Sequence, residues 1–214
     1  MKDFKEAAAQ YYTDSGIELV TKVWESIIKV KNVDEKNDFL KKFKSGYENR
    51  PSIRHSKPSN TIPDPIIDTI IHARMPKLAS KDIELIRFGH RLSMAAENIL
   101  GLMLEEYIHT KVLKFGWSCC WGNCIKAVDF CSENGILLQV KNRSNTENSS
   151  SNKIREGTEI IKWYRVNATS GACYWNELNT IIGKAKLTNE DDFQEYCKSL
   201  ITRNPYALAI EDQA

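Results

Sequence analysis

The sequence predicts an α/β protein in which a mixed central sheet is flanked by helices and preceded by a helical N-terminal part. Apolar residues in the first third recur at spacings of three and four, the period of amphipathic helices. Short apolar runs with period-two alternation occupy the middle, and two further helical segments close the chain. With 214 residues, we expect one domain: a helical part over 1–57, a core over 62–175 and C-terminal helices over 176–214.

The N-terminal part contains three segments with helical periodicity, followed by a proline-rich loop. The loop, RPSIRHSKPSNTIPDP, holds four prolines and lacks an apolar period. It is either a solvated connector or a basic segment that follows a nucleic-acid backbone through Arg50, Arg54, His55 and Lys57. The predicted helices cover Phe4–Tyr12, Ile17–Val30 and Asp34–Tyr47.

A long helix is predicted from Ser80, a suitable N-cap, to about Phe115, with Gly116 as its stop. A polar residue, Glu97, lies on this helix among alanine, isoleucine and leucine. A carboxylate in such surroundings is costly to bury unless a positive charge or a metal ion meets it, so Glu97 is either half of a structural ion pair or a functional group. The expected core stripe is Leu92, Ala96, Ile99, Met103 and Tyr107.

A hairpin is predicted between the runs AVDF and ILLQVK, which are separated by Glu133-Asn134-Gly135. If Asn134 is the centre of a three-residue loop, Asp129 lies opposite Gln139. Side chains alternate along a strand, so Asp129, Gln139 and Lys141 then project from one face. The other face is entirely apolar and favours this register: Val128, Phe130, Leu138 and Val140. A third strand is expected over Ile160–Val166, and helices over Trp175–Gly183 and Glu190–Ile201.

An acid on one strand, with an acid-like group and a lysine two apart on its partner, is the layout of a metal-dependent phosphodiesterase site. Phosphodiester hydrolysis needs an activated water and a stabilised anionic transition state, and Mg²⁺ on oxygen ligands supplies both. We expect Asp129 to anchor the metal and Lys141 to orient or deprotonate the water. Gln139 brings an oxygen without charge, so a further acid should contribute, and Glu97 is the first candidate. The remaining expected metal ligand is the backbone carbonyl of Val140.

The segment after Lys141 is polar and basic and has few hydrophobic residues, which suits a DNA-contacting surface. Arginine and asparagine can read guanine and adenine edges, whereas serine and lysine suit phosphates. Candidate base contacts are Asn145, Glu147, Asn148 and Arg155, and candidate phosphate contacts are Ser149, Ser150, Ser151 and Lys153. Arg143 is expected near the cut phosphate and the base edges, and Asn142 and Ser144 complete the expected DNA-binding segment.

Several blocks of this chain resemble the SinI-type family of type II restriction endonucleases, which has a PD-(D/E)xK nuclease core. They are HRLSMAAENILGLMLEEYI, GWSCCWG, VDF and LLQVKNRSNTENSSSNKIREGTEIIKWYR, and the similarity runs from about Ile62 to about Trp175. The resemblance implies Mg²⁺-dependent double-strand cleavage of DNA at a short palindromic site of the GGWCC or GGNCC kind. It also implies a helix glutamate beside the metal and a homodimer matching a two-fold site. A cognate methyltransferase is expected genetically, not as a stable complex.

Composition describes a globular protein near neutrality, with 42% hydrophobic and 27% charged residues and a net charge of +2. This balance disfavours a general polyanion-coating role. No apolar run approaches a membrane span, and MKDFKEAAAQYY lacks a signal-peptide core, so a cytoplasmic protein with reduced cysteines is expected. The cluster of four cysteines could alternatively indicate structural zinc, although its spacing lacks a CxxC pair: Cys119, Cys120, Cys124 and Cys131.

Two alternative functions are consistent with the same residues. A repair or mobile-element nuclease on this core would cut at a lesion or junction instead of a sequence. A catalytically lapsed DNA-binding protein would explain the uncharged Gln139.

Overall fold

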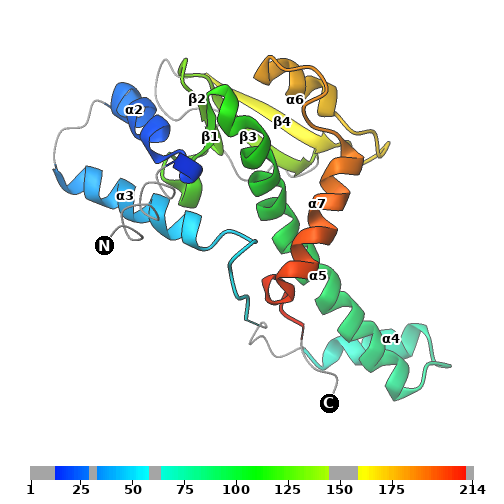
Figure 1. Cartoon of the computed structure of the whole chain (residues 1–214). Helices are drawn as coiled ribbons and strands as arrows, with labels where there is room; N and C mark the ends of the chain where they lie inside the picture. Colours follow the sequence, from blue (N-terminus) through cyan, green and yellow to red (C-terminus); the bar gives the residue numbers. More distant parts are fainter. Residues whose placement is uncertain (1–12, 29–32, 58–63, 145–158, 211–214) are drawn as a thin grey trace.

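The computed structural model describes residues 13–28, 33–57, 64–144 and 159–210. Four helices precede the strands and two follow them, and Figure 1 shows the sheet at one end of the molecule with a long helix leading away from it. The helices are α2 (Ile17–Ile28), α3 (Val33–Glu48), α4 (Ile66–Arg74), α5 (Ser80–Val112), α6 (Trp175–Ile182) and α7 (Glu190–Arg203). The strands are β1 (Trp117–Cys119), β2 (Phe130–Ser132), β3 (Leu137–Arg143) and β4 (Ile160–Val166).

The four described strands form one mixed sheet in the order β1-β2-β3-β4. β1, β2 and β3 are antiparallel neighbours, whereas β4 pairs parallel to β3. The predicted mixed sheet is therefore confirmed, and β4 has the predicted bounds. Helices surround this sheet: α5 contacts β1 and β3, α2 contacts β1 and β2, and α6 contacts β4.

The core forms where the C-terminal half of α5 meets the sheet and the last two helices. Its largest fully buried side chains include Trp163 of β4 and Tyr107 of α5. Aromatic rings connect these elements, since Tyr107 and Trp163 each lie beside Trp175, with centroids 5.7 and 5.3 Å apart. Burying rings of this size supplies much of the stabilisation of a small core.

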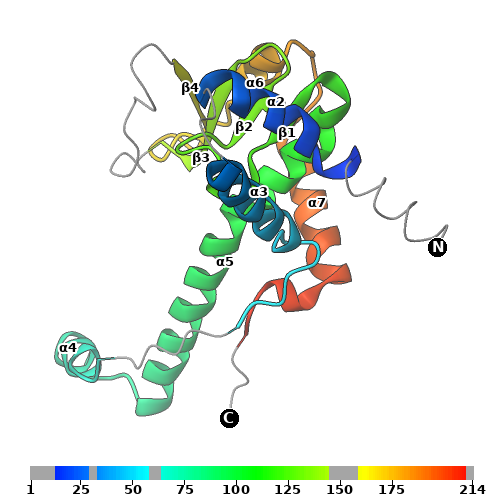
Figure 2. The same cartoon turned by 90° about the vertical axis from the view of Figure 1, so that its left-hand side faces the viewer.

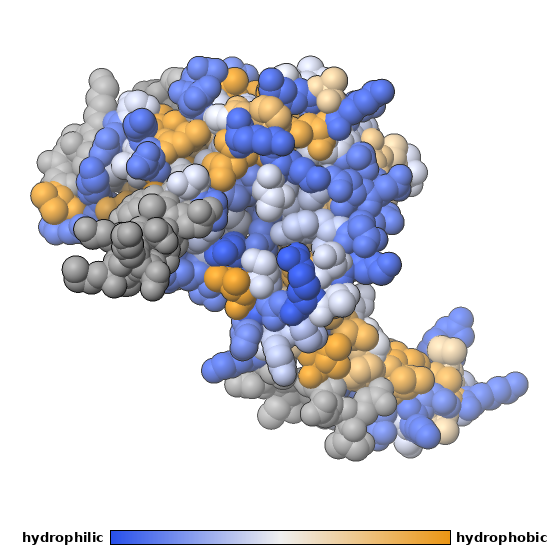
Figure 3. Space-filling model, in the orientation of Figure 1, coloured by the Kyte–Doolittle hydropathy of each residue, from blue (hydrophilic) through white to orange (hydrophobic). Residues whose placement is uncertain are grey.

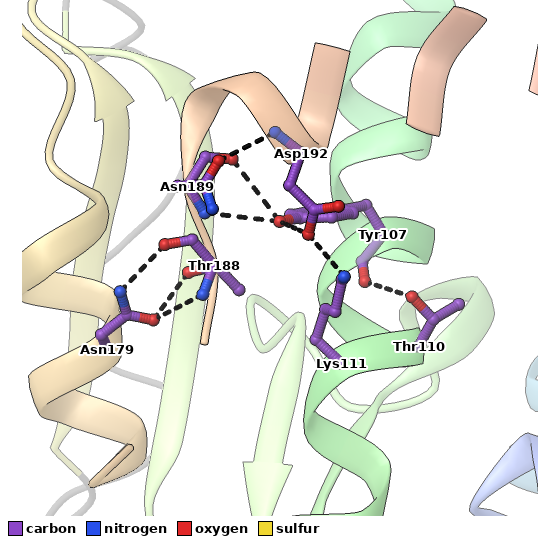
Figure 4. A network of polar contacts seen from close by, with 7 residues as sticks. All are labelled: Tyr107, Thr110, Lys111, Asn179, Thr188, Asn189 and Asp192. Atoms are coloured by element: carbon purple, nitrogen blue, oxygen red, sulfur yellow. Dashed lines mark hydrogen bonds and ion pairs between the residues drawn. The ribbon is translucent and has the colours of Figure 1, made fainter. Parts of the chain in front are cut away.

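A polar network fastens α7 to α5 and α6 (Figure 4). The Tyr107 hydroxyl donates to Asp192 at 2.9 Å, and Lys111 pairs with the same carboxylate. Asn189 caps α7 by accepting from the Asp192 backbone N–H at 2.8 Å. On the α6 side, the Asn179 amide exchanges hydrogen bonds with the Thr188 backbone at 2.9 Å. Satisfied polar contacts of this kind, of which those of Asn179 and Thr188 are buried, fix the orientation of the helices they join.

Helix α3 packs against the 3₁₀ turn Trp121–Asn123 through two glycines. A Cβ at Gly46 would lie 2.1 Å from the Gly122 backbone nitrogen, and Gly122 has φ of +69°. Neither position can accept a larger residue without moving backbone, so the glycines allow the close approach.

The N-terminal half of α5 leaves the sheet and carries α4 at its end (Figures 1 and 2). We call α4 together with residues 80–98 of α5 the arm. No helix is predicted from the sequence over residues 66–74, so α4 is a finding of the structure. Within the described part of the chain, no helix is long and apolar enough to span a membrane.

Most other helix boundaries agree with the sequence prediction. The predicted N-cap of α5 is wrong by one residue: Ala79 is the N-cap, and Ser80 is the first helical residue. Helix α5 continues through a 3₁₀ turn to Phe115, and Gly116 then adopts φ of +74°, as expected for a stop. The predicted helix Phe4–Tyr12 lies outside the described residues.

Candidate active site

The hairpin that carries the predicted site has the expected register. Phe130 pairs with Leu138 and Cys131 with Leu137, the pairing that sets Asp129 opposite Gln139. Gly135 closes the loop with φ of +81°. The period-two pattern and the turn residue were therefore sufficient to predict which strand positions face one another.

Asp129 lies just before β2, where its partly buried carboxylate touches the adjacent strand. The backbone N–H of Val140 donates to Asp129 Oδ2 at 2.7 Å. Burial raises the pKa of Asp129, while the Val140 hydrogen bond and the positive charge of Lys141 act in the opposite direction. The carboxylate is consequently anchored to the β3 backbone beside the lysine of the predicted motif.

A second carboxylate, Glu105 of α5, reaches this position from the neighbouring helix. Burial and then the negative charge of Asp129 raise the pKa of Glu105 to about 8, and Lys141 partly offsets them. Two carboxylates therefore share one partly buried site with a single lysine. When both are ionised, the three side chains carry one uncompensated negative charge, which a divalent cation would neutralise.

Glu97, the helix acid predicted from the sequence, is not brought to this site. It is exposed on the arm, eight residues before Glu105, or roughly 12 Å along a helix axis. The prediction for Glu97 is wrong because α5 packs against the core only from about Ile99 onward. Glu97 lies on the preceding part, which extends away from the core, so its carboxylate remains in water. The missed signal was the pair Glu105-Glu106 within the most apolar stretch of the helix, LMLEEYI.

Glu106, the other member of that pair, is a structural residue. It is buried, accepts from the Ser52 backbone N–H at 2.9 Å and pairs with Arg50 at 3.3 Å. This contact attaches the segment after α3 to α5. Glu105, in contrast, feels the negative charge of Asp129.

Gln139 is buried, and its amide has a structural contact. Gln139 Nε2 donates to the backbone carbonyl of Ala127 at 3.2 Å. Ala127 has φ of +61°, an uncommon conformation for a residue with a Cβ, and it lies two residues before Asp129. A glutamate at position 139 would place a carboxylate oxygen against that carbonyl. The amide therefore supports the turn that positions Asp129.

The first three residues of the predicted DNA-contacting segment are described. Arg143 is exposed and shares strand parity with Lys141, so it projects on the same face. Asn142 Oδ1 accepts from Arg165 Nε at 2.8 Å, and Ser144 accepts from the Ala168 backbone N–H at 3.0 Å. The other candidates lie outside the described residues: Asn145, Glu147, Asn148, Ser149, Ser150, Ser151, Lys153 and Arg155.

The four clustered cysteines are buried thiols near the site. Burial raises the pKa of Cys119 and of Cys120, which disfavours the thiolate form that binds zinc. Among the described residues, no group of three or more His, Cys, Asp or Glu side chains has the geometry of a metal site. The candidate oxygen donors are instead the Asp129 and Glu105 carboxylates with nearby amide and backbone oxygens, a donor type that suits Mg²⁺.

Comparison with known proteins decides the relationship of this chain. The model of the SinI restriction endonuclease family matches residues 11–203. The chain belongs to this family. It is 39% identical over 155 residues to the type II restriction enzyme Eco47I of Escherichia coli, covering 70% of this chain and 66% of that protein. It is 40% identical over 151 residues to the type II restriction enzyme SinI of Salmonella infantis, covering 68% and 65%.

Family membership confirms the resemblance found in the sequence and agrees with the observed mixed α/β fold. The aligned region spans slightly less than two thirds of each relative's length.

Proposed function

We propose that this protein is a type II restriction endonuclease that makes Mg²⁺-dependent double-strand breaks in DNA. The observation that carries the proposal is that the charges of Asp129 and Lys141 both act on Glu105, in a chain of this family. Two carboxylates beside a lysine match the needs of metal-assisted phosphodiester hydrolysis. The proposed target is a short palindromic site of the GGWCC or GGNCC kind.

In this proposal Asp129 and Glu105 hold the metal, and the Val140 carbonyl and Gln139 amide oxygen are further candidate donors. Bound Mg²⁺ would supply Lewis-acid stabilisation of the anionic transition state and lower the pKa of its water. The Lys141 ammonium offsets charge on the cut phosphate and orients the attacking water. The Val140 N–H fixes the rotamer of Asp129, so the carboxylate is positioned before the substrate arrives.

DNA recognition is assigned to the segment that begins at Asn142. Arg143 is exposed two residues after Lys141 and on the same strand face, so it is placed to contact a base edge or phosphate near the cut. Asn142 and Ser144 make contacts within the protein, which position the start of the segment. We retain the predicted contacts from Asn145 to Arg155 as part of the proposal.

The proposed cellular setting follows from the reaction. Cleavage of both strands at a two-fold site calls for a homodimer with one active site per strand. An enzyme that cuts unprotected DNA also calls for a cognate methyltransferase encoded with it and for residence in the cytoplasm beside the DNA.

Digestion of a long unmethylated DNA with Mg²⁺, followed by sequencing of the ends, tests the function. We expect discrete fragments that share one short motif, abolished by Asp129→Ala and retained by Asp191→Ala on the exposed start of α7. Cleavage without a shared motif would instead support a repair or mobile-element nuclease. Sequence-selective binding without cleavage would identify a lapsed nuclease, and the absence of both would refute the proposal.

A further inference from the structure

The arm leaves an unusual amount of apolar side chain uncovered. Helix α4 has no buried residue, although four of its nine residues are isoleucine. Isoleucines 66, 67 and 70 are 63%, 48% and 62% exposed. An isolated helix of this length is marginal in water, because helices in proteins are stabilised mainly by packing an apolar face. The surface of α4 therefore calls for a covering partner.

The facing part of α5 shows the same feature. Between Ser80 and Asn98 only Ile83 is buried, whereas Leu85, Ile86 and Met94 are 61%, 44% and 46% exposed. Figure 3 shows apolar surface gathered along the arm, away from the body of the molecule. Together with those of α4 they expose on the order of 600 Å², near the upper limit for a patch on a monomer and close to the roughly 800 Å² that each partner buries in a stable dimer.

The arm also contains a groove into which such a surface fits. A cavity of about 800 Å³ lies between α4, α5, residues 54–57 and the segment after α7. Its apolar lining includes Ile67, Ile71, Ile86, Met94, Leu208 and Ile210. The stretches that follow its borders in sequence, 58–63 and 211–214, contain a single large apolar side chain, Ile62. These two stretches thus offer little apolar surface to fill the groove.

The charges around this groove are complementary to α4 itself. Arg54, Lys57 and Arg91 line the groove, whereas the exposed Asp64 directly precedes the first turn of α4. The other acid of this turn, Asp68, is already paired with Arg87 of α5 in the same chain at 2.6 Å. The Nε atom of Arg54 is buried without a hydrogen-bond acceptor among the described residues. Inserting the acidic end of an α4 helix from a second molecule would bring carboxylates to this basic rim.

We propose that the arm is the dimerisation surface: the exposed α4 ridge of Ile66 and Ile70 from each protomer packs in the arm groove of the other. One patch that carries both ridge and groove is self-complementary, which is the property of an isologous two-fold interface. The inference rests on the proposed double-strand cleavage for its choice of partner, since that reaction calls for two copies of this chain. Helix α5 then joins the dimer surface directly to Glu105.

The mass of the full chain in solution, measured by sedimentation velocity over a range of concentrations, tests the inference. We expect the wild type to reach twice its 24.5 kDa chain mass. Ile70→Asp should raise the dissociation constant at least about 100-fold, because both protomers lose a buried isoleucine. Val33→Asp is the matched control, since Val33 is an apolar helix residue that is 73% exposed on α3.

Ile70→Ser serves as a milder variant, and circular dichroism confirms that each protein is folded. A wild type that remains monomeric both free and on its DNA, or a folded Ile70→Asp that still dimerises, would overturn the inference. Cleavage assays on the same samples separate it from the proposed function. Cleavage by a monomeric wild type would retain the function and reject the arm. Loss of the dimer in Ile70→Asp, with a wild type that never cleaves, would retain the arm and reject the function.

Discussion

At the scale of single residues, the balance of three charges distinguishes this site from an ordinary solvated hairpin face. Asp129 and Glu105 repel each other in partly buried surroundings, and Lys141 compensates only one of them. A site optimised for stability alone would pair each carboxylate with a cation or replace it by an apolar residue. Retaining two carboxylates beside a single lysine is typical of a functional site that binds a cation.

This balance predicts an unusual pH dependence of stability in the metal-free protein. The ordinary pKa of a glutamate is 4.5, and that of Glu105 in the fold is about 8. Between these values the folded protein keeps a proton that the unfolded chain releases, so stability falls as pH rises. We expect Glu105→Gln to remove this decrease. Melting temperatures of both proteins from about pH 5 to about pH 9 in chelator check it.

Comparing the two proteins cancels the titration of other groups, such as His109, whose pKa is lowered by burial. Mg²⁺ should raise the melting temperature of the wild type more at the alkaline end, where it no longer competes with a proton, and should have less effect on Glu105→Gln. Parallel curves for the two proteins would show that Glu105 is ionised in the fold.

The sequence predicted those features of the site that depend on residues close together in the chain. Alternation along β3 and the turn at Gly135 fix which side chains accompany Asp129, and both are visible in the residue order. The helix acid was misplaced because it depends on where α5 leaves the sheet. That point is determined by contacts with β1, β3 and α7, distant in sequence, and not by the periodicity of the helix itself.

At the scale of elements, strand and helix limits were largely predictable, whereas contacts between elements were not. Apolar period and glycine stops predicted β4, α6 and the end of α5. The helix α4 was missed because its isoleucines lie next to a proline-rich loop and pack against no described core. The close contact of α3 with the Trp121–Asn123 turn could not be predicted from the sequence either. It depends on the backbones of two glycines that are 76 residues apart in the chain.

That contact predicts that Gly46→Ala is destabilising. Its new methyl group would lie 2.1 Å from the Gly122 nitrogen, so α3 must move away from the turn. We expect a loss of roughly 2–3 kcal/mol in the free energy of unfolding, measured by urea denaturation. Gly89→Ala is the control, because a Cβ there meets nothing within 4 Å. It should be neutral or stabilise α5 by about 0.5–1 kcal/mol. Equal effects of the two substitutions would contradict the close approach.

At the scale of the whole molecule, α5 connects two functions that the proposals assign to opposite ends of one helix. Glu105 faces the sheet in its second half, and the arm lies in its first half. If the arms join two protomers, the two long helices set the distance between the two active sites. The dimer geometry would then determine which phosphates on the two strands are cut.

This arrangement predicts that each protomer cuts one strand independently of the chemistry in the other. Dimers that combine one wild-type chain with one Asp129→Ala chain should convert supercoiled plasmid to nicked circle instead of linear DNA. Mixed dimers can be isolated by placing different affinity tags on the two chains and purifying over both. Wild-type dimers carrying both tags, prepared in the same way, control for the tags. Arg143 and the rest of the DNA-contacting segment remain intact in both chains, so binding should be unchanged while only one strand is hydrolysed. Linear product from mixed dimers would show that one active site cuts both strands, and the two-fold arrangement of sites would then be wrong.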